Sequence, residues 1–123
     1  MEKLEKEIIK LKLGLSLQRI IANNKLKKQE NKAIGKKDLK LVTSLRQLEA
    51  ASGVDFPAIQ KISTGKMNAS STAIVAIADG LNLTLPEFWS YYEKITDKEA
   101  LEYKRSIEEA KKKKTTAHSS KKK

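Results

Sequence analysis

The sequence predicts an all-α protein, and two observations lead to this prediction. Apolar residues recur at three- and four-residue steps in most segments, as they do on one face of a helix. Helix-capping residues precede several of these segments, and no run of alternating apolar and polar residues indicates a strand. We therefore expect about five core helices within residues 1–93, an extra helix over 94–110 and a disordered Lys-rich tail over 111–123.

Residues 1–25 predict one long helix, or two short helices broken near Gly14, because a glycine costs about 1 kcal/mol in a helix relative to alanine. Two apolar stripes have helical spacing in this segment: Leu4, Ile8, Leu11 and Leu15, and then Leu13, Leu17, Ile20 and Ile21. The first stripe either packs on the protein's own domain or meets a coiled-coil partner.

Residues 26–42 form a basic insertion with six lysines, two acidic residues and Gly35 in the middle. We expect a surface loop or a marginal helical turn here. The next segment, SLRQLEAASG, predicts a short helix with Ser44 as its N-cap and Gly53 as a left-handed residue after its end.

The segment DFPAIQKISTGK predicts a second short helix over residues 55–64. Asp55 is the expected N-cap, and Pro57 is tolerated in the first turn, where the backbone N–H groups have no helical acceptor. Ile59 and Ile62 lie three residues apart and are expected to face the core, and Gly65 ends the helix.

Three further helices are expected. One begins at Ser70 or Ser71 and ends near Asn82, and the next begins with the capping-box pair Thr84 and Glu87. The same pair spacing recurs at Thr96 and Glu99 before the helix expected to end at residue 110. The core should include Ile59, Ile62, Ile74, Ile77, Leu81 and Phe88.

Residues 44–89 resemble the phage-repressor-like (lambda-repressor-like, XRE) helix-turn-helix family. The resemblance rests on several marks at unbroken spacing: Gly53 and Val54 at the turn, Ile59 and Ile62, Gly65-Lys66, Asn68 and the phrase IADGLNLTLPEF. It implies a lambda-repressor-like five-helix bundle whose helix-turn-helix motif spans residues 44–66. Glu49 stands where the family favours alanine, so its carboxylate should tilt towards solvent or open the helix crossing.

The resemblance implies sequence-specific binding of double-stranded DNA and a role in transcription regulation, with the helix 55–64 in the major groove. Phe56, Pro57 and Lys61 match positions that meet base edges, and Gln60 adds an amide nearby. Two alternative interpretations of Phe56 involve no base contact: its side chain packs under its own helix, or it anchors a protein partner. The expected phosphate contacts are Ser44, Arg46, Thr64, Lys66 and Asn68.

The charge distribution leaves alternatives to this function open. The chain carries +11 in total, but residues 41–93 hold 3 Lys/Arg against 5 Asp/Glu, so that the basic charge lies in the flanking segments. One alternative is a protein-interaction module, antitoxin-like or regulatory, on a helix-turn-helix scaffold that no longer reads bases. Another is a non-specific nucleoid or RNA binder that uses only its basic tails.

The composition argues against other classes. The chain has no cysteine, and His118, its single histidine, lies in the tail, so we expect no metal site, no cofactor and no enzyme activity. We expect a cytoplasmic protein, because no apolar run is long enough for a membrane span or a signal peptide. A homodimer is expected on DNA, formed through the first apolar stripe or through the helix around Tyr103 and Ile107.

Overall fold

A computed structural model describes residues 2–35 and 41–121, with side chains described as far as Lys112. These residues form six helices and no strand: α1 (Lys3–Ala33), α2 (Leu45–Ser52), α3 (Phe56–Ser63), α4 (Ser71–Gly80), α5 (Leu85–Glu93) and α6 (Asp97–Lys121). The predicted all-α class is confirmed.

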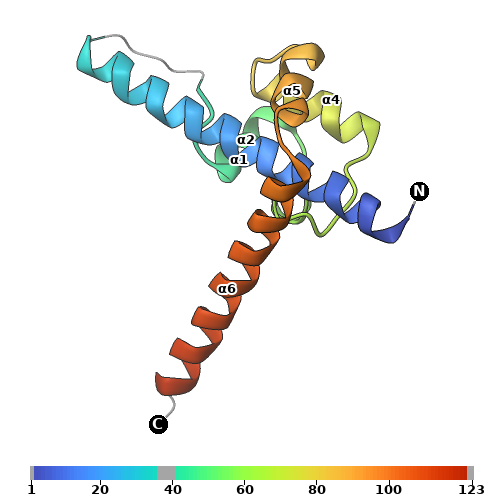
Figure 1. Cartoon of the computed structure of the whole chain (residues 1–123). Helices are drawn as coiled ribbons and strands as arrows, with labels where there is room; N and C mark the ends of the chain where they lie inside the picture. Colours follow the sequence, from blue (N-terminus) through green and yellow to red (C-terminus); the bar gives the residue numbers. More distant parts are fainter. Residues whose placement is uncertain (1, 36–40, 122–123) are drawn as a thin grey trace.

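The long helix α1 is the element on which the rest of the fold is built. Helices α3, α5 and α6 all pack against it, and α2 and α4 pack on each other (Figure 1). The helix is not broken at Gly14, and this glycine lies against the end of α3. A Cβ atom at this position would come within 2.5 Å of the Ser63 carbonyl oxygen and 2.8 Å of that of Ile62.

The hydrophobic core joins α1 to the four short helices. Five of the six residues expected in the core are buried in it, and the sixth, Ile74, is partly buried against it. The apolar residues of α1 are mostly used inside the chain, since Leu11, Leu13, Leu17, Ile20 and Ile21 are all buried. Four of these five residues belong to the second stripe; in the first stripe Leu11 is buried, Ile8 and Leu15 are half-buried and Leu4 is 54% exposed, so only part of the first stripe packs on the protein's own domain.

Local capping fixes where the short helices begin. Ser44 and Ser70 accept hydrogen bonds from the backbone N–H groups of Gln47 and Ala73, each at 3.1 Å, and Thr84 forms a reciprocal capping box with Glu87. Gly53 and Asn82 have positive φ angles of 76° and 58° after the ends of α2 and α4. These predictions are confirmed.

Two expected irregular segments are helical instead. Helix α1 continues into the basic insertion as far as Ala33, because Leu, Lys, Gln, Glu and Ala are good helix formers; residues 36–40 lie outside the described part of the chain. Helix α6 does not end at residue 110 but continues to Lys121, so the tail is not disordered over residues 111–121. This segment contains no glycine or proline to stop the helix.

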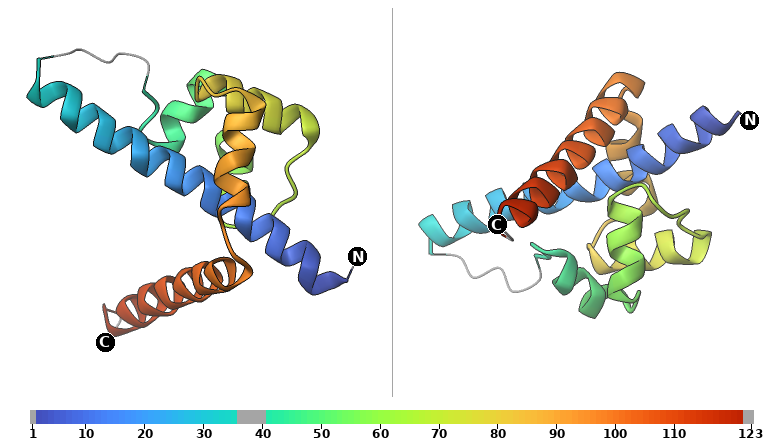
Figure 2. Two further views of the ribbon diagram at one scale, coloured as in Figure 1. Left: turned by 45° about the horizontal axis from the view of Figure 1, so that its top comes forward. Right: turned by 90° about the horizontal axis from the view of Figure 1, so that it is seen from below.

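Helix α6 crosses α1 and then leaves the bundle, as Figure 1 and the left panel of Figure 2 show. Three ion pairs join the two helices: Lys12 with Asp97 at 2.7 Å, Arg19 with Glu99, and Lys104 with Glu7. Apolar contact accompanies them, because Ala100 is fully buried. The first half of α6 is thus held on the bundle, while its second half projects from it.

Candidate nucleic-acid interface

A tight turn sets the angle between α2 and α3. Gly53 takes the left-handed conformation, and its N–H donates to the Glu49 carbonyl oxygen at 2.9 Å. The Val54 N–H donates to the Ser52 hydroxyl at 3.1 Å. Only Gly53, Val54 and Asp55 lie between the two eight-residue helices.

The core contacts of α3 decide which of its faces meets solvent. Ile59 and Ile62 are 0% and 2% exposed, as their spacing predicted. Pro57, Gln60 and Lys61 are exposed on the other side of the helix. Three of the four side chains expected to read bases therefore share one solvent-facing surface.

Glu49 corrects the expectation that a carboxylate here would tilt outward or open the crossing. It is half-buried, and its Oε2 accepts a hydrogen bond of 2.6 Å from the Phe56 N–H, at the first residue of α3. Asp55 occupies the N-cap position, but its side chain makes no capping hydrogen bond. A carboxylate near a helix N-terminus also interacts favourably with the helix dipole. Glu49 therefore joins α2 to α3.

Phe56 is half-buried, and the guanidinium group of Arg46 lies over its ring. The guanidinium carbon of Arg46 lies 3.7 Å from the ring centroid, a distance typical of cation–π stacking. Arg46, which we expected at a phosphate, thus rests on the side chain that we expected at a base. The pair forms a single surface at the start of α3.

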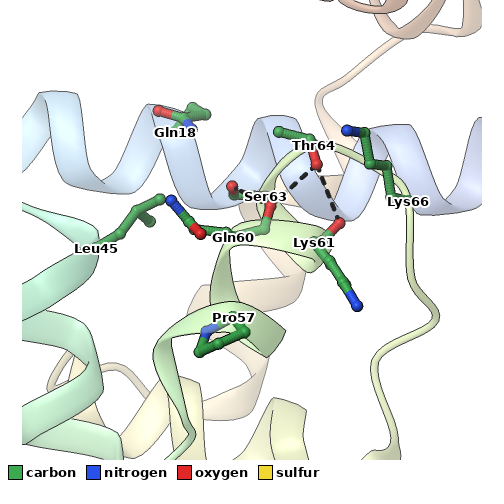
Figure 3. Close-up of a pocket in the computed structure, with 8 residues that line it drawn as sticks. All are labelled: Gln18, Leu45, Pro57, Gln60, Lys61, Ser63, Thr64 and Lys66. Carbon is green, nitrogen blue, oxygen red and sulfur yellow. Dashed lines mark hydrogen bonds between the residues drawn. The ribbon is translucent and has the colours of Figure 1, made fainter.

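An open groove of about 500 Å³ runs along the exposed side of α3 (Figure 3). Five of the predicted site residues line it: Pro57, Gln60, Lys61, Thr64 and Lys66. The other lining residues are Gln18 of α1, Leu45 of α2 and Ser63 of α3. Phe56, Ser44, Arg46 and Asn68 do not line it. The structure therefore brings a majority of the predicted site residues together, and the other four lie outside the groove.

The hydroxyl groups among the predicted phosphate contacts already have partners. The Ser44 Oγ accepts the N–H of Gln47, and the Thr64 hydroxyl donates to the carbonyl oxygens of Gln60 and Lys61 at 3.0 and 3.3 Å. Lys66 and Asn68, by contrast, are exposed after the end of α3. Lys66 follows Gly65, whose φ of 73° turns the chain out of the helix.

Helix α6 approaches this end of α3, which the sequence did not predict. The Tyr103 hydroxyl donates a hydrogen bond of 2.5 Å to the Ser63 carbonyl oxygen, beside the groove. Burial raises the pKa of Tyr103, and a hydrogen bond with the Gln18 side chain acts against this rise. Tyr103 and Gln18 were missed because their proximity to α3 depends on the packing of α1 and α6, which leaves no local signal.

Basic side chains also lie near this end of α3. The neighbouring Lys111 side chain lowers the pKa of Lys66, and the positive charge of Lys61 lowers it further. Three cationic side chains from α3, the turn after it and α6 therefore lie close to one another.

Other kinds of site find no support in the described part of the chain. Among the side chains that the structure describes, those of residues 2–35 and 41–112, no cluster of His, Cys, Asp or Glu is able to hold a metal ion. None of the described helices is long and apolar enough to cross a membrane. Comparison with protein-family models, curated proteins and solved structures finds no significant match.

Proposed function

We propose that the protein binds double-stranded DNA in a sequence-specific manner and regulates transcription, with α3 in the major groove. One observation carries the proposal. The exposed face of α3 presents Pro57, Gln60 and Lys61 together beside an open groove, while Ile59 and Ile62 hold the opposite face in the core. The major groove of B-form DNA is wide enough to admit such a helix.

The chemistry of this face suits base edges. A lysine donates to the O6 and N7 atoms of guanine, and a glutamine amide pairs with the N6 and N7 atoms of adenine. Apolar side chains contact the thymine methyl group, a role open to Pro57 and to Phe56 beneath Arg46. Lys66 and Asn68, exposed after α3, are placed in this proposal at backbone phosphates.

Selection of bound sequences from a random duplex pool tests the proposal. We expect a preferred site, and we expect Lys61→Ala and Gln60→Ala each to weaken binding to that site by about 1–3 kcal/mol. Gln60→Ala should leave the affinity for random DNA nearly unchanged, because it removes no charge. Titration by fluorescence anisotropy measures both affinities.

Lys98→Ala is the matched control for Lys61→Ala. Lys98 is equally exposed but lies in the first turn of α6, so this change removes one charge without touching α3. It should reduce specific and random binding alike. A wild-type protein with no preferred duplex would contradict base reading by α3 and favour the protein-interaction module or the non-specific binder that uses only its basic tails. A preference that survives both α3 substitutions would mean that another part of the chain reads the bases.

The proposal includes pairing of two copies, since one such module covers only a half-site. In the first apolar stripe of α1, Leu11 is buried and Ile8 and Leu15 are half-buried, and Tyr103 and Ile107 of α6 are also half-buried. Leu4 and Leu101 remain exposed, and each lies one helical turn from a member of the Glu7–Lys104 ion pair. Sedimentation of the wild type and of a Leu4→Glu/Leu101→Glu variant, free and on DNA, tests this part.

A further inference from the structure

The end of α1 projects from the bundle as a basic arm, residues 25–33 (Figure 1). The lysines of the arm are exposed, and Leu26 is 58% exposed, so the arm buries little surface. The ion pairs that α1 forms with other described residues lie nearer its start, at Glu7, Lys12 and Arg19. Within the described part of the chain, Lys25 and Lys32 therefore have no carboxylate partner.

One face of α1 runs along the groove beside α3. Leu11 packs directly on Gly65, next to Lys66. Gln18, seven positions later, lines the groove at the end opposite Lys66 (Figure 3). Seven residues make nearly two helical turns, so Leu11 and Gln18 lie within about 20° of each other around α1.

The same seven-residue step continues into the basic arm. Lys25 and Lys32 follow Gln18 by seven and fourteen positions. They therefore lie within about 40° of Gln18 around the helix, and about 10 and 21 Å further along its axis. The groove-side face of α1 thus becomes a row of exposed lysines where the helix leaves the bundle.

The opposite side of α1 faces α5. The Asn23 amide donates a hydrogen bond of 3.1 Å to the Tyr91 hydroxyl. Lys27 follows Asn23 by four positions and lies on this side, about 160° around the helix from Lys25. Glu30, the one acidic residue of the arm, lies about 140° from Lys25. The positive charge on the groove side is therefore not neutralised by the arm itself.

We propose that Lys25 and Lys32 bind backbone phosphates of duplex DNA beside the segment that α3 contacts, so that the basic arm is a second DNA-contacting element. This proposal rests on the DNA-binding function proposed above and extends it to a helix outside residues 44–89. The major groove is bordered by the phosphates of both strands. A row of lysines that continues one wall of the α3 groove suits such a border, because lysine contacts phosphate without reading sequence.

Salt-dependent binding by the full-length chain tests the role of the arm. The probe is a random-sequence duplex, titrated by fluorescence anisotropy over a range of salt concentrations. We expect Lys25→Ala and Lys32→Ala each to reduce the slope of log K against log salt by about 0.9, the value for one phosphate contact. The double variant should reduce it by about 1.8.

Lys27→Ala is the matched control, because it removes the same charge from an exposed position of the same arm on the side of α5. Its change in slope should be less than half that of Lys25→Ala or Lys32→Ala. Equal effects of the three single variants, or no change in the double variant, would overturn the proposal. Thermal unfolding checks that each variant is folded, as expected for substitutions of exposed residues.

The outcomes separate this inference from the proposed function. If no preferred sequence is selected while Lys25→Ala and Lys32→Ala still flatten the slope more than Lys27→Ala, the arm is supported and base reading by α3 fails. If a preferred site is selected and the three variants behave alike, base reading stands and the arm is overturned. Binding of duplex RNA with the Lys25 and Lys32 dependence, without binding of duplex DNA, would also overturn it.

Discussion

Glu49 shows how one side chain can decide the start of a neighbouring helix. The Phe56 N–H is among the first backbone donors of α3 and has no acceptor within its own helix. The side chain of Asp55 does not cap it. The Glu49 carboxylate reaches across the turn and accepts this hydrogen bond at 2.6 Å, so the position that the family resemblance assigned to alanine is used for capping.

Replacing Glu49 should therefore destabilise the fold. We expect Glu49→Ala to lower the free energy of unfolding by about 1–2 kcal/mol, the usual loss for a helix cap. Glu49→Gln should cost less, because the amide oxygen still accepts a hydrogen bond. Urea unfolding measures both changes, with Glu93→Ala at an exposed position as the control. Equal stability of Glu49→Ala and the control would show that the hydrogen bond contributes nothing.

Some of the helix caps could be predicted from the sequence, and others could not. Ser44, Ser70 and the Thr84–Glu87 pair act on N–H groups three residues away, so sequence spacing alone reveals them. Glu49 acts on a residue seven positions away, across a turn. The Arg46–Phe56 stack spans ten positions in the same way. Such contacts depend on the angle between helices and have no signature of their own.

At the scale of elements, Gly14 determines how closely α1 and α3 approach. On helix propensity alone, Gly14→Ala would stabilise α1 by about 1 kcal/mol. The new methyl group, however, would lie 2.5 Å from the Ser63 carbonyl oxygen, a backbone atom that cannot move without shifting α3. Overpacking of this kind costs about 1–3 kcal/mol, so we expect a net loss of stability.

Thermal or urea unfolding decides the sign for Gly14→Ala. Gln29→Ala is the control, since Gln29 is exposed on the same helix and should change stability by less than about 0.5 kcal/mol. Because the clash involves the end of α3, the variant should also weaken binding to a selected DNA site more than binding to random DNA. A stabilised Gly14→Ala protein would mean that α1 and α3 have room to separate freely.

The basic insertion should be dispensable for folding. Asn24 is buried and donates to the Val42 carbonyl oxygen at 2.9 Å, so the two ends of the insertion already lie together. The part of α1 beyond Asn24 buries little, with Leu26 and Ile34 58% and 67% exposed. We expect replacement of residues 26–40 by a short Gly/Ser linker to change the free energy of unfolding by less than about 1 kcal/mol.

Urea unfolding checks this prediction, and a shortened protein that fails to fold would contradict it. The same variant tests whether the insertion contacts DNA. Six lysines are removed. If they contact phosphates, the slope of log K for DNA binding against log salt concentration should become flatter in this variant.

The elements themselves were largely predictable, but their ends and partners were not. Apolar spacing and caps gave α2 to α5, because short amphipathic helices carry their own signals. The helical segments 26–33 and 111–121 lack an apolar face, so no periodicity revealed them; only the propensities of lysine and alanine favour helix there. The contact of α6 with α3 depends on three helices at once.

At the scale of the whole molecule, the fold places positive charge beside a nearly neutral bundle. Residues 41–93 hold 3 Lys/Arg and 5 Asp/Glu, whereas residues 94–123 hold 11 and 5. A nearly neutral surface alone would attract DNA weakly. The hydrogen bond from Tyr103 to the Ser63 carbonyl oxygen joins α6 to the end of α3, so the orientation of one helix couples the basic segment to the face of α3.

The attachment of α6 to α1 should weaken at acid pH. Hydrogen bonding from Lys104 lowers the pKa of Glu7, and hydrogen bonding from Arg19, followed by that from the Thr96 N–H, lowers the pKa of Glu99. Because folding lowers both pKa values, the stabilisation is present above their ordinary value of 4.5 and is lost as the pH falls through the folded values below it. We therefore expect α6 to loosen on α1 below pH 4.5 while the core helices persist.

Hydrogen exchange of the α6 amides around Tyr103, compared with those of α4, measures this loosening. A Glu7→Gln/Glu99→Gln variant should show the same loosening at pH 7, because glutamine keeps the capping partner of Thr96 but removes the charge that faces Arg19. If α6 stays protected in the variant, apolar contact and the Tyr103–Ser63 hydrogen bond are sufficient to hold it. The ion pairs would then have no part in orienting α6 beside α3.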